Sequence, residues 1–165
     1  MNTVFKELTD NSKVLIFPGN RILNSDEKEF LRKSINKFLS QWKSHGKQMR
    51  AYCEVLYSIF IVIGIDENYG EGSGCSKDAL GHKIKQLGQE LNVDFFKNGN
   101  LIFFQGEEIE VVPFEGIKEA VKNNKIQNNT PVFNYVETNK DFKERWLIPA
   151  ESSWLKSYLN IKDLV

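Results

Sequence analysis

The sequence predicts an α+β protein with a ferredoxin-like core, a split βαβ sheet with two helices on one face. Two observations favour it. Short apolar runs bounded by glycine, proline or polar residues alternate with two longer segments of helical apolar period. Their order as far as Gln105 is β-α-β-β-α-β, which is typical of this antiparallel arrangement. We place the core at about residues 13–105 and a C-terminal β-α-β-α extension at about 107–165, within a single domain spanning 1–165.

The first strand and the first long helix have clear local signals. The apolar run 13–17 is stopped by Pro18-Gly19, which predicts a buried strand. Asn24 can cap the next helix, and Glu27 completes a capping-box pattern. Apolar residues then recur at helical spacing, and His45-Gly46 is the expected end because glycine supplies a left-handed cap.

A hairpin and a second long helix follow. Residues 48–57 alternate loosely and residues 59–65 are apolar throughout, with a tight turn expected near Tyr57-Ser58. A strand that is apolar on both faces is normally covered on both. The next helix is predicted from Ser76, as N-cap, to Leu91. The glycines inside it, at positions 81 and 88, each cost ~1 kcal/mol relative to alanine, which indicates close packing there.

The extension combines shorter elements. We expect a hairpin of strands 101–105 and 108–112, a helix over 114–123, a strand over 130–136, and helical turns starting near Thr138 and over 151–159.

Composition and charge exclude several classes of protein. The chain is 41% apolar and 27% charged, as in ordinary globular proteins. Lys+Arg and Asp+Glu number 22 each, so a nucleic-acid partner is not expected. No apolar stretch approaches the ~18 residues of a membrane span, and no leader peptide is visible. Two cysteines do not make a disulfide framework. We expect a soluble cytoplasmic protein with no membrane partner.

The strongest functional signal is the segment from Asp66 to Ser76. Cys75 lies beside the predicted helix N-terminus, where the positive end of the helix dipole stabilises a thiolate. A cysteine nucleophile also needs a base, for which His45 and His82 are the candidates. Asp66 could act as a general acid or base. The alternatives are a small packed residue at Cys75 and a solvated strand end at Asp66.

The same loop could bind an anion. Gly72, Ser73, Gly74 and Ser76 have the composition of a backbone nest that holds phosphate. We expect the first and third core strands to be adjacent and parallel, which would bring Arg21 close to Asp66 and Cys75. Arg21 would then complete an anion pocket, or pair with the carboxylates at the end of the third strand. No metal-ligand spacing is present, so no metal and no cofactor are expected.

Six short motifs are spread along most of the chain: Trp42-Lys-Ser-His-Gly-Lys, Asp66-Glu67, Ser73-Gly-Cys-Ser76, Val132-Phe-Asn134, Trp146-x-x-Pro149 and Ser153-Trp154. This pattern resembles a family of small uncharacterised Bacteroidota proteins, which has no established activity and so implies no site residues. Some members are labelled "ABC transporter ATPase". The phosphate-binding motif Gly-x-x-x-x-Gly-Lys-Ser/Thr is absent here, with Cys75 where the lysine would stand. We expect no ATP hydrolysis.

Large aromatic residues gather at the C-terminus. Trp146 precedes Pro149, and Trp154 and Tyr158 share a helical face. We expect them to pack onto the domain. If they are exposed, they would instead form a surface for a partner or a homodimer, because Trp and Tyr dominate interface hot spots.

The sequence favours a binding or interaction domain, because no complete catalytic constellation is evident. Its partner is open, with a small anionic ligand and a protein as the two candidates. The alternative is a small enzyme or anion-binding protein that uses the 68–76 loop with Cys75, Asp66 and Arg21.

Overall fold

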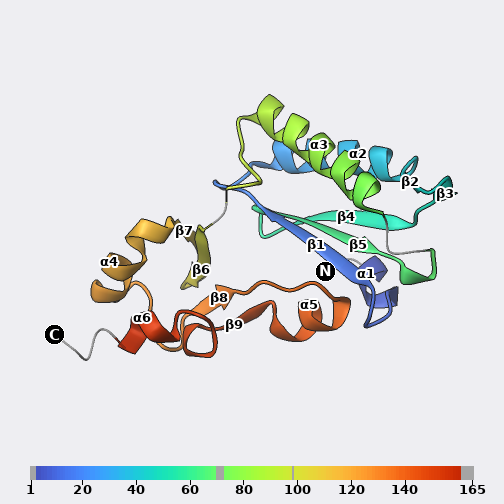
Figure 1. Ribbon diagram of the computed structural model, residues 1–165. Coiled ribbons are helices and arrows are strands. Elements are labelled where there is room, and N and C mark those ends of the chain that lie inside the picture. The colour runs from blue at the N-terminus through green and yellow to red at the C-terminus, as the bar shows by residue number, and fades with distance from the viewer. Residues whose placement is uncertain (1–2, 70–72, 98, 161–165) are drawn as a thin grey trace. The chain divides into compact units, whose positions relative to one another are not determined.

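The computed structural model describes residues 3–69, 73–97 and 99–160, and the chain divides into two compact units. The first unit consists of residues 1–97 and 136–143, and the second of residues 98–135 and 144–165. Both contain helices and antiparallel sheets (Figure 1), so the predicted α+β class is confirmed.

The sheet of the first unit has three strands. They are β1 (Lys13–Pro18), β4 (Ala51–Leu56) and β5 (Phe60–Ile65), in the order β1-β5-β4. Helix α2 (Ser25–Leu39) connects β1 to β4, and α2 and α3 (Gly74–Leu91) lie on the same face of the sheet (Figure 1). Because β5 is antiparallel to both neighbours, β1 and β4 run parallel with β5 between them. This is a split βαβ arrangement.

The expected parallel pairing of the first and third core strands, now β1 and β5, is wrong. A tight turn joins β4 to β5, and Tyr57 and Ser58 in it have positive φ of 52° and 55°. A hairpin forces its strands to be antiparallel. Since the α2 crossover makes β4 parallel to β1, β5 must oppose β1.

A complete ferredoxin-like sheet is not confirmed. The strand expected to be its fourth, β6 (Leu101–Gln105), belongs to the sheet of the second unit. The free edge of β1 is instead met by the segment before α5: Lys13 forms an antiparallel bridge with Thr138, and the Val14 N–H donates to the Glu137 carbonyl at 2.9 Å.

Helix α2 begins as predicted and ends earlier. The Asn24 side chain accepts from the Glu27 N–H and the Glu27 carboxylate accepts from the Asn24 N–H, so the capping box is confirmed. The helix stops at Leu39 because a small hairpin, β2 (Lys43–Ser44) and β3 (Lys47–Gln48), follows. His45-Gly46 is its turn, with positive φ at both residues, and not a helix cap.

The N-cap of helix α3 lies three residues before the predicted cap, Ser76. This N-cap is Ser73, whose hydroxyl accepts from the Ser76 N–H at 3.1 Å, and the C-cap of the helix is Asn92 with φ 56°. The close packing expected at the helix glycines is present at Gly88, where an added Cβ would lie 2.5 Å from the Val93 carbonyl oxygen. It is absent at Gly81, which has no neighbour within 4 Å of an added Cβ.

Both faces of β5 are covered, as its apolar composition predicts. All six residues are buried, and Ile61, Ile63 and Ile65 join one core cluster with apolar residues of α2 and α3. The opposite face meets α1 (Thr3–Glu7) and the residue after it. A Cβ at Gly64 would lie 2.5 Å from a Leu8 methyl group and 2.8 Å from the Phe5 ring, so a larger residue there would force these side chains to shift.

Asn139 holds the segment 136–143 to the N-terminal part of the same unit. It is fully buried, and its Nδ2 donates to the carbonyls of Phe5, Leu8 and Thr9 at 2.9–3.3 Å. The rings of Phe5 and Phe142 pack nearby with centroids 5.7 Å apart. These contacts place the first residues of α5 (Asn139–Arg145) in the first unit.

The second unit contains a four-stranded antiparallel sheet in the order β7-β6-β8-β9. The predicted hairpin of β6 with β7 (Glu108–Val112) is confirmed, with Gly106 in its turn at φ 66°. The other elements are β8 (Pro131–Phe133), β9 (Leu147–Pro149), α4 (Ile117–Lys122), α6 (Lys156–Asn160) and the short 3-10 helices η2 (Phe114–Gly116) and η3 (Ala150–Ser152). None of the helices in the described parts of the chain could cross a membrane.

The aromatic C-terminus is only partly packed. Trp146 is 6% exposed, as expected for a core residue, and its ring lies 4.9 Å from that of Phe133. Trp154 is 49% exposed, so its expected burial is wrong. Its ring makes an edge contact with that of Tyr158, with centroids 5.8 Å apart; Trp154 lies in the turn just before α6, which carries Tyr158.

Candidate functional site

The expected cluster of Arg21 with Asp66 and Cys75 does not form. Pro18 pairs with Phe60 and Lys13 with Ile65, so the chain leaves β1 towards Arg21 at one end of the sheet and leaves β5 towards Asp66 at the other. Helix α3 has 18 residues, a length of about 27 Å at 1.5 Å per residue. Its N-terminal end carries Cys75, whereas its C-terminal end contacts Arg21.

Arg21 is tied into the fold. Its guanidinium makes a bidentate pair with Glu27 at 2.7 and 3.0 Å, and it donates to the Leu91 carbonyl, the last residue of α3, at 2.7 Å. The Arg21 hydrogen bonds, together with the Asn24 N–H, lower the pKa of Glu27 to about 2. Arg21 therefore joins the start of α2 to the end of α3.

The hydroxyls of the predicted anion loop serve the start of α3. Ser76 is buried, its N–H and its hydroxyl both bond to Ser73, and its carbonyl accepts from the Trp42 indole N–H at 2.8 Å. The Ser73 N–H donates to the Ser44 hydroxyl at 2.9 Å. Gly74 is exposed in the first turn of α3, and Gly72 lies outside the described residues.

Cys75 lies exposed in the first turn of α3. The bond between Ser44 and Ser73 brings the β2–β3 hairpin, with His45 in its turn, to the start of this helix. Among the hydrogen bonds of the described residues, none joins Cys75 to His45 or to His82, which is exposed on α3. The thiol is accessible, and its pairing with a base is not formed in this structure.

An arginine that the sequence reasoning missed lies at this end of the sheet. The Arg50 carbonyl accepts from the Asp66 N–H at 2.8 Å, next to the pair Ala51–Ile65. The Arg50 guanidinium donates to the hydroxyls of Tyr52 and Tyr69, and its carbon lies 5.4 Å from the centre of the Tyr69 ring. The hydrogen bond to the Tyr52 hydroxyl raises the pKa of Arg50 above its ordinary value. We call Arg50, Tyr52 and Tyr69 the Arg50 cluster.

Within the described residues, the charge of Arg50 is not balanced by a carboxylate. No Asp or Glu within the described residues forms an ion pair with Arg50. The carboxylate of Asp66, its partner in backbone bonding, accepts from the Asn68 N–H at 3.1 Å. Tyr69, in the 3-10 helix η1 (Glu67–Tyr69), is 49% exposed, and Arg50 is exposed as well.

The hairpin beside the Arg50 cluster is also positively charged. Lys43, His45 and Lys47 are all exposed, and residues 41–53 contain no Asp or Glu. We call residues 43–50 the basic hairpin. The signal in the sequence was the run of basic residues without an acid, although the position of Arg50 across from Asp66 depends on the three-residue loop 57–59 between the paired Leu56 and Phe60. The composition of the whole chain hides this basic run, because its net charge is zero.

The other candidate groups are structural or scattered. Cys53 is buried, and burial raises the pKa of its thiol to about 12. No three His, Cys, Asp or Glu side chains in the described ranges gather closely enough to bind a metal ion.

Comparison with protein-family models, with curated proteins and with solved structures gave no match for this chain. Membership of the Bacteroidota family that the sequence resembles stays a prediction. No relative assigns a role to any residue of the basic hairpin or the Arg50 cluster.

Proposed function

We propose that this protein is a non-enzymatic cytoplasmic binding domain that docks an acidic segment of a partner protein on the basic hairpin and the Arg50 cluster. One observation carries the proposal: Arg50 is exposed, and the groups described around its guanidinium are the neutral phenols of Tyr52 and Tyr69. A carboxylate of a partner would supply a counter-charge that the described residues do not provide.

The chemistry of the surface supports a protein partner. Arginine and tyrosine are enriched among residues that dominate binding energy at interfaces. The two phenols orient the guanidinium and leave part of it exposed, which lowers the entropy lost on binding. Lys43 and Lys47 extend the positive surface, and complementary charge accelerates association.

Helix α3 adds to the positive electrostatic potential of this surface. Its N-terminus is joined to the basic hairpin by the bond between Ser73 and Ser44, and a helix N-terminus carries a positive partial charge. The hairpin, Arg50 and the start of α3 therefore favour an anionic partner together. Asp66 opposes them, although its carboxylate is partly satisfied by Asn68.

The test is a titration with a fluorescein-labelled, C-terminally amidated peptide of about eight glutamates, followed by fluorescence anisotropy. We expect binding that weakens as ionic strength rises from ~0.05 to ~0.5 M, because exposed charges are screened. Arg50→Met should weaken binding about tenfold, and Lys47→Met less.

Lys28→Met is the matched control, since it removes one positive charge from α2 at the Arg21 end. It should leave the affinity within about twofold. No binding at low salt, or equal losses in Arg50→Met and Lys28→Met, would contradict the proposal.

A second candidate is a small enzyme with Cys75 as nucleophile. The observation that favours it is the exposed thiol in the first turn of α3, with the hairpin that carries His45 bonded to Ser73. The rate of iodoacetamide labelling should then stay high at pH 6, where an ordinary thiol of pKa ~8.5 has almost no thiolate. His45→Ala should lower that rate. A rate that falls with pH as in a model thiol, and ignores His45→Ala, would exclude this reading.

A further inference from the structure

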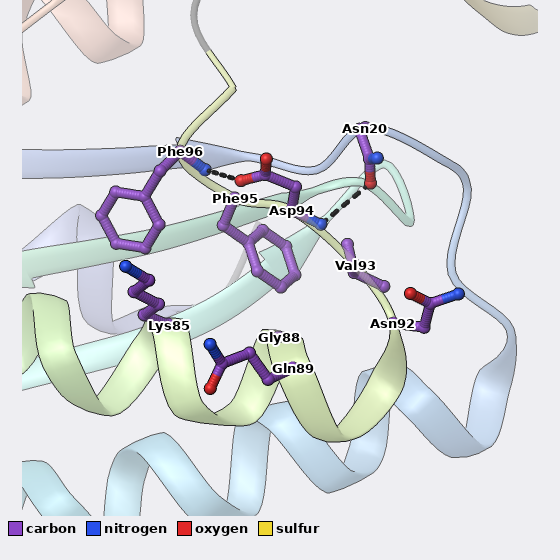
Figure 2. A pocket seen from close by; sticks show the side chains of 9 residues that line it. All are labelled: Asn20, Lys85, Gly88, Gln89, Asn92, Val93, Asp94, Phe95 and Phe96. Carbon is purple, nitrogen blue, oxygen red and sulfur yellow. Dashed lines mark hydrogen bonds between the residues drawn. The ribbon is translucent and has the colours of Figure 1, made fainter.

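A hollow of about 300 Å³ lies at the C-terminal end of α3, away from the basic hairpin (Figure 2). It is formed by the last turns of α3, the loop that follows, and Asn20. Its volume is at the lower end of the range for small-molecule sites. The lining residues that bear on its chemistry are Asn20, Lys85, Gln89, Asp94 and Phe96.

Hydrogen bonds fix the loop that forms one wall. The Asp94 N–H donates to the Asn20 side-chain oxygen at 3.0 Å, and the Phe96 N–H donates to Asp94 Oδ1 at 2.8 Å (Figure 2). Below them Phe95 is buried against Gly88, where an added Cβ would lie 3.2 Å from its ring. The wall is therefore formed before any ligand binds.

Two opposite charges line the hollow without pairing. Neither Lys85 nor Asp94 forms an ion pair with a residue that the structure describes. Asp94 uses Oδ1 for the loop, which leaves Oδ2 as an acceptor. Asn20 uses its oxygen, which leaves its NH₂ group as a donor. Gln89 lies one helical turn after Lys85 and so on the same side of α3.

The hollow also has an apolar side. The Phe96 ring is 44% exposed, and it packs edge-on against Phe17 with centroids 5.6 Å apart. In Figure 2 the ring points over the hollow on the same side as the Lys85 ammonium. An aromatic or aliphatic group placed there would cover exposed ring surface.

We propose that this hollow binds a free α-amino acid with an apolar or aromatic side chain. Its carboxylate would be bound by Lys85 and by the NH₂ group of Gln89, which lie on the same side of the hollow (Figure 2). Its ammonium would be bound by Asp94 Oδ2, beside the C-terminus of α3, whose partial charge is negative. Its side chain would lie against Phe96. A phosphate ligand fits poorly, because one lysine would face both Asp94 and the negative end of the helix.

The test is a titration of the ¹⁵N-labelled protein with L-phenylalanine, followed by NMR. The expected result is a saturable shift of the amide signals of Gln89, Asp94 and Phe96. Phenylethylamine lacks the carboxylate and 3-phenylpropanoate lacks the ammonium, so each should bind at least about tenfold more weakly. No shift with L-phenylalanine, or equal binding of all three compounds, would overturn the proposal.

Two substitutions remove a charge from the hollow while keeping the size of the side chain, so that a loss of binding can be told from a loss of folding. Asp94→Asn keeps the side-chain oxygen that accepts from Phe96 and removes the charge, and Lys85→Met keeps the length of the side chain. Each should weaken L-phenylalanine binding about tenfold, with a dispersed spectrum that shows an intact fold. Lys77→Met, an exposed lysine in the first turns of α3, is the control and should bind as the wild type does. Wild-type affinity in Asp94→Asn and Lys85→Met would also overturn the proposal.

Discussion

Arg21 at the C-terminal end of α3 and Arg50 near its N-terminal end carry the same charge in different surroundings. Arg21 is held by both oxygens of Glu27 and by the carbonyl that ends the helix. Arg50 donates to two phenols and forms no described ion pair. Arg21 is therefore a part of the fold, whereas Arg50 is the arginine that we propose binds a partner. An arginine near a loop indicates a binding surface only when its counter-charge is missing.

The two cysteines give the largest expected difference. Burial raises the pKa of Cys53 to about 12, and at pH 8 this leaves about a thousandfold less thiolate than an ordinary thiol of pKa ~8.5. Cys75, at the exposed end of α3, should be labelled by iodoacetamide while Cys53 is not, as peptide mass mapping would show. Labelling of both in the folded protein would mean that the β4–β5 sheet opens readily.

Glycine substitutions distinguish the packed end of α3 from its middle. Gly88→Ala should lower the free energy of unfolding by ~1–3 kcal/mol, because its Cβ would meet the Val93 carbonyl oxygen at 2.5 Å. Gly81→Ala has open space and should raise it by up to ~1 kcal/mol. Urea unfolding followed by circular dichroism measures both. If Gly88→Ala were as stable as Gly81→Ala, the tight packing at that end would be refuted.

At the N-terminal end of α3, the Trp42 indole N–H donates to the Ser76 carbonyl in a buried position. Trp42→Phe keeps most of the ring and loses this bond, so it should lower the free energy of unfolding by ~1–2 kcal/mol. Trp154→Phe is a control, because Trp154 is half exposed and should tolerate the change. Equal stability of the two variants in a urea titration would count against the role of this bond.

The ion pair of Arg21 with Glu27 should make the stability of the fold depend on pH in acid. The folded-state pKa of Glu27 is lowered to about 2 from an ordinary value of 4.5. A lowered carboxylate pKa means that the folded state binds fewer protons than the unfolded state, so this stabilisation is present above pH ~4.5 and is lost between pH ~4.5 and ~2.

The melting temperature of the wild type should fall across that interval more steeply than that of Arg21→Met, measured by circular dichroism. Because the pair is partly exposed, the difference should be small. Parallel curves for the two proteins would show that the pair does not contribute.

Local signals predicted the parts of the fold that local chemistry decides. The Asn24 capping box, the turn at Tyr57-Ser58 and the two-sided burial of β5 all follow from nearby residues. The start of α3 does not. Ser73 and Ser76 are equal as caps, and Ser44 and Trp42, about thirty residues earlier in the chain, hold the N-terminal turn in place.

The sequence predicted Arg21 beside Asp66 and Cys75 at the end of β5, whereas the structure places Arg50 beside Asp66 there. Asp66, Ser73 and Cys75 do lie at that end. The error came from the direction of β5, which the hairpin turn reverses relative to β1. The three-residue loop 57–59, between the paired Leu56 and Phe60, sets the register that places Arg50 beside Asp66. Exposure of Trp154 could not be predicted, because it depends on what the second unit packs around α6.

The central claim is that an acidic partner docks at the Arg50 end of the first unit and leaves the Arg21 end untouched. The most direct measurement is an NMR titration of the ¹⁵N-labelled protein with an acetylated and amidated glutamate peptide, whose blocked ends cannot mimic an amino acid. We predict shifts at Ser44, Lys47, Arg50 and Tyr69, and none at Ile22, Leu91 or Asp94. Shifts centred on Arg21 and the end of α3, or no shifts at low salt, would contradict the account.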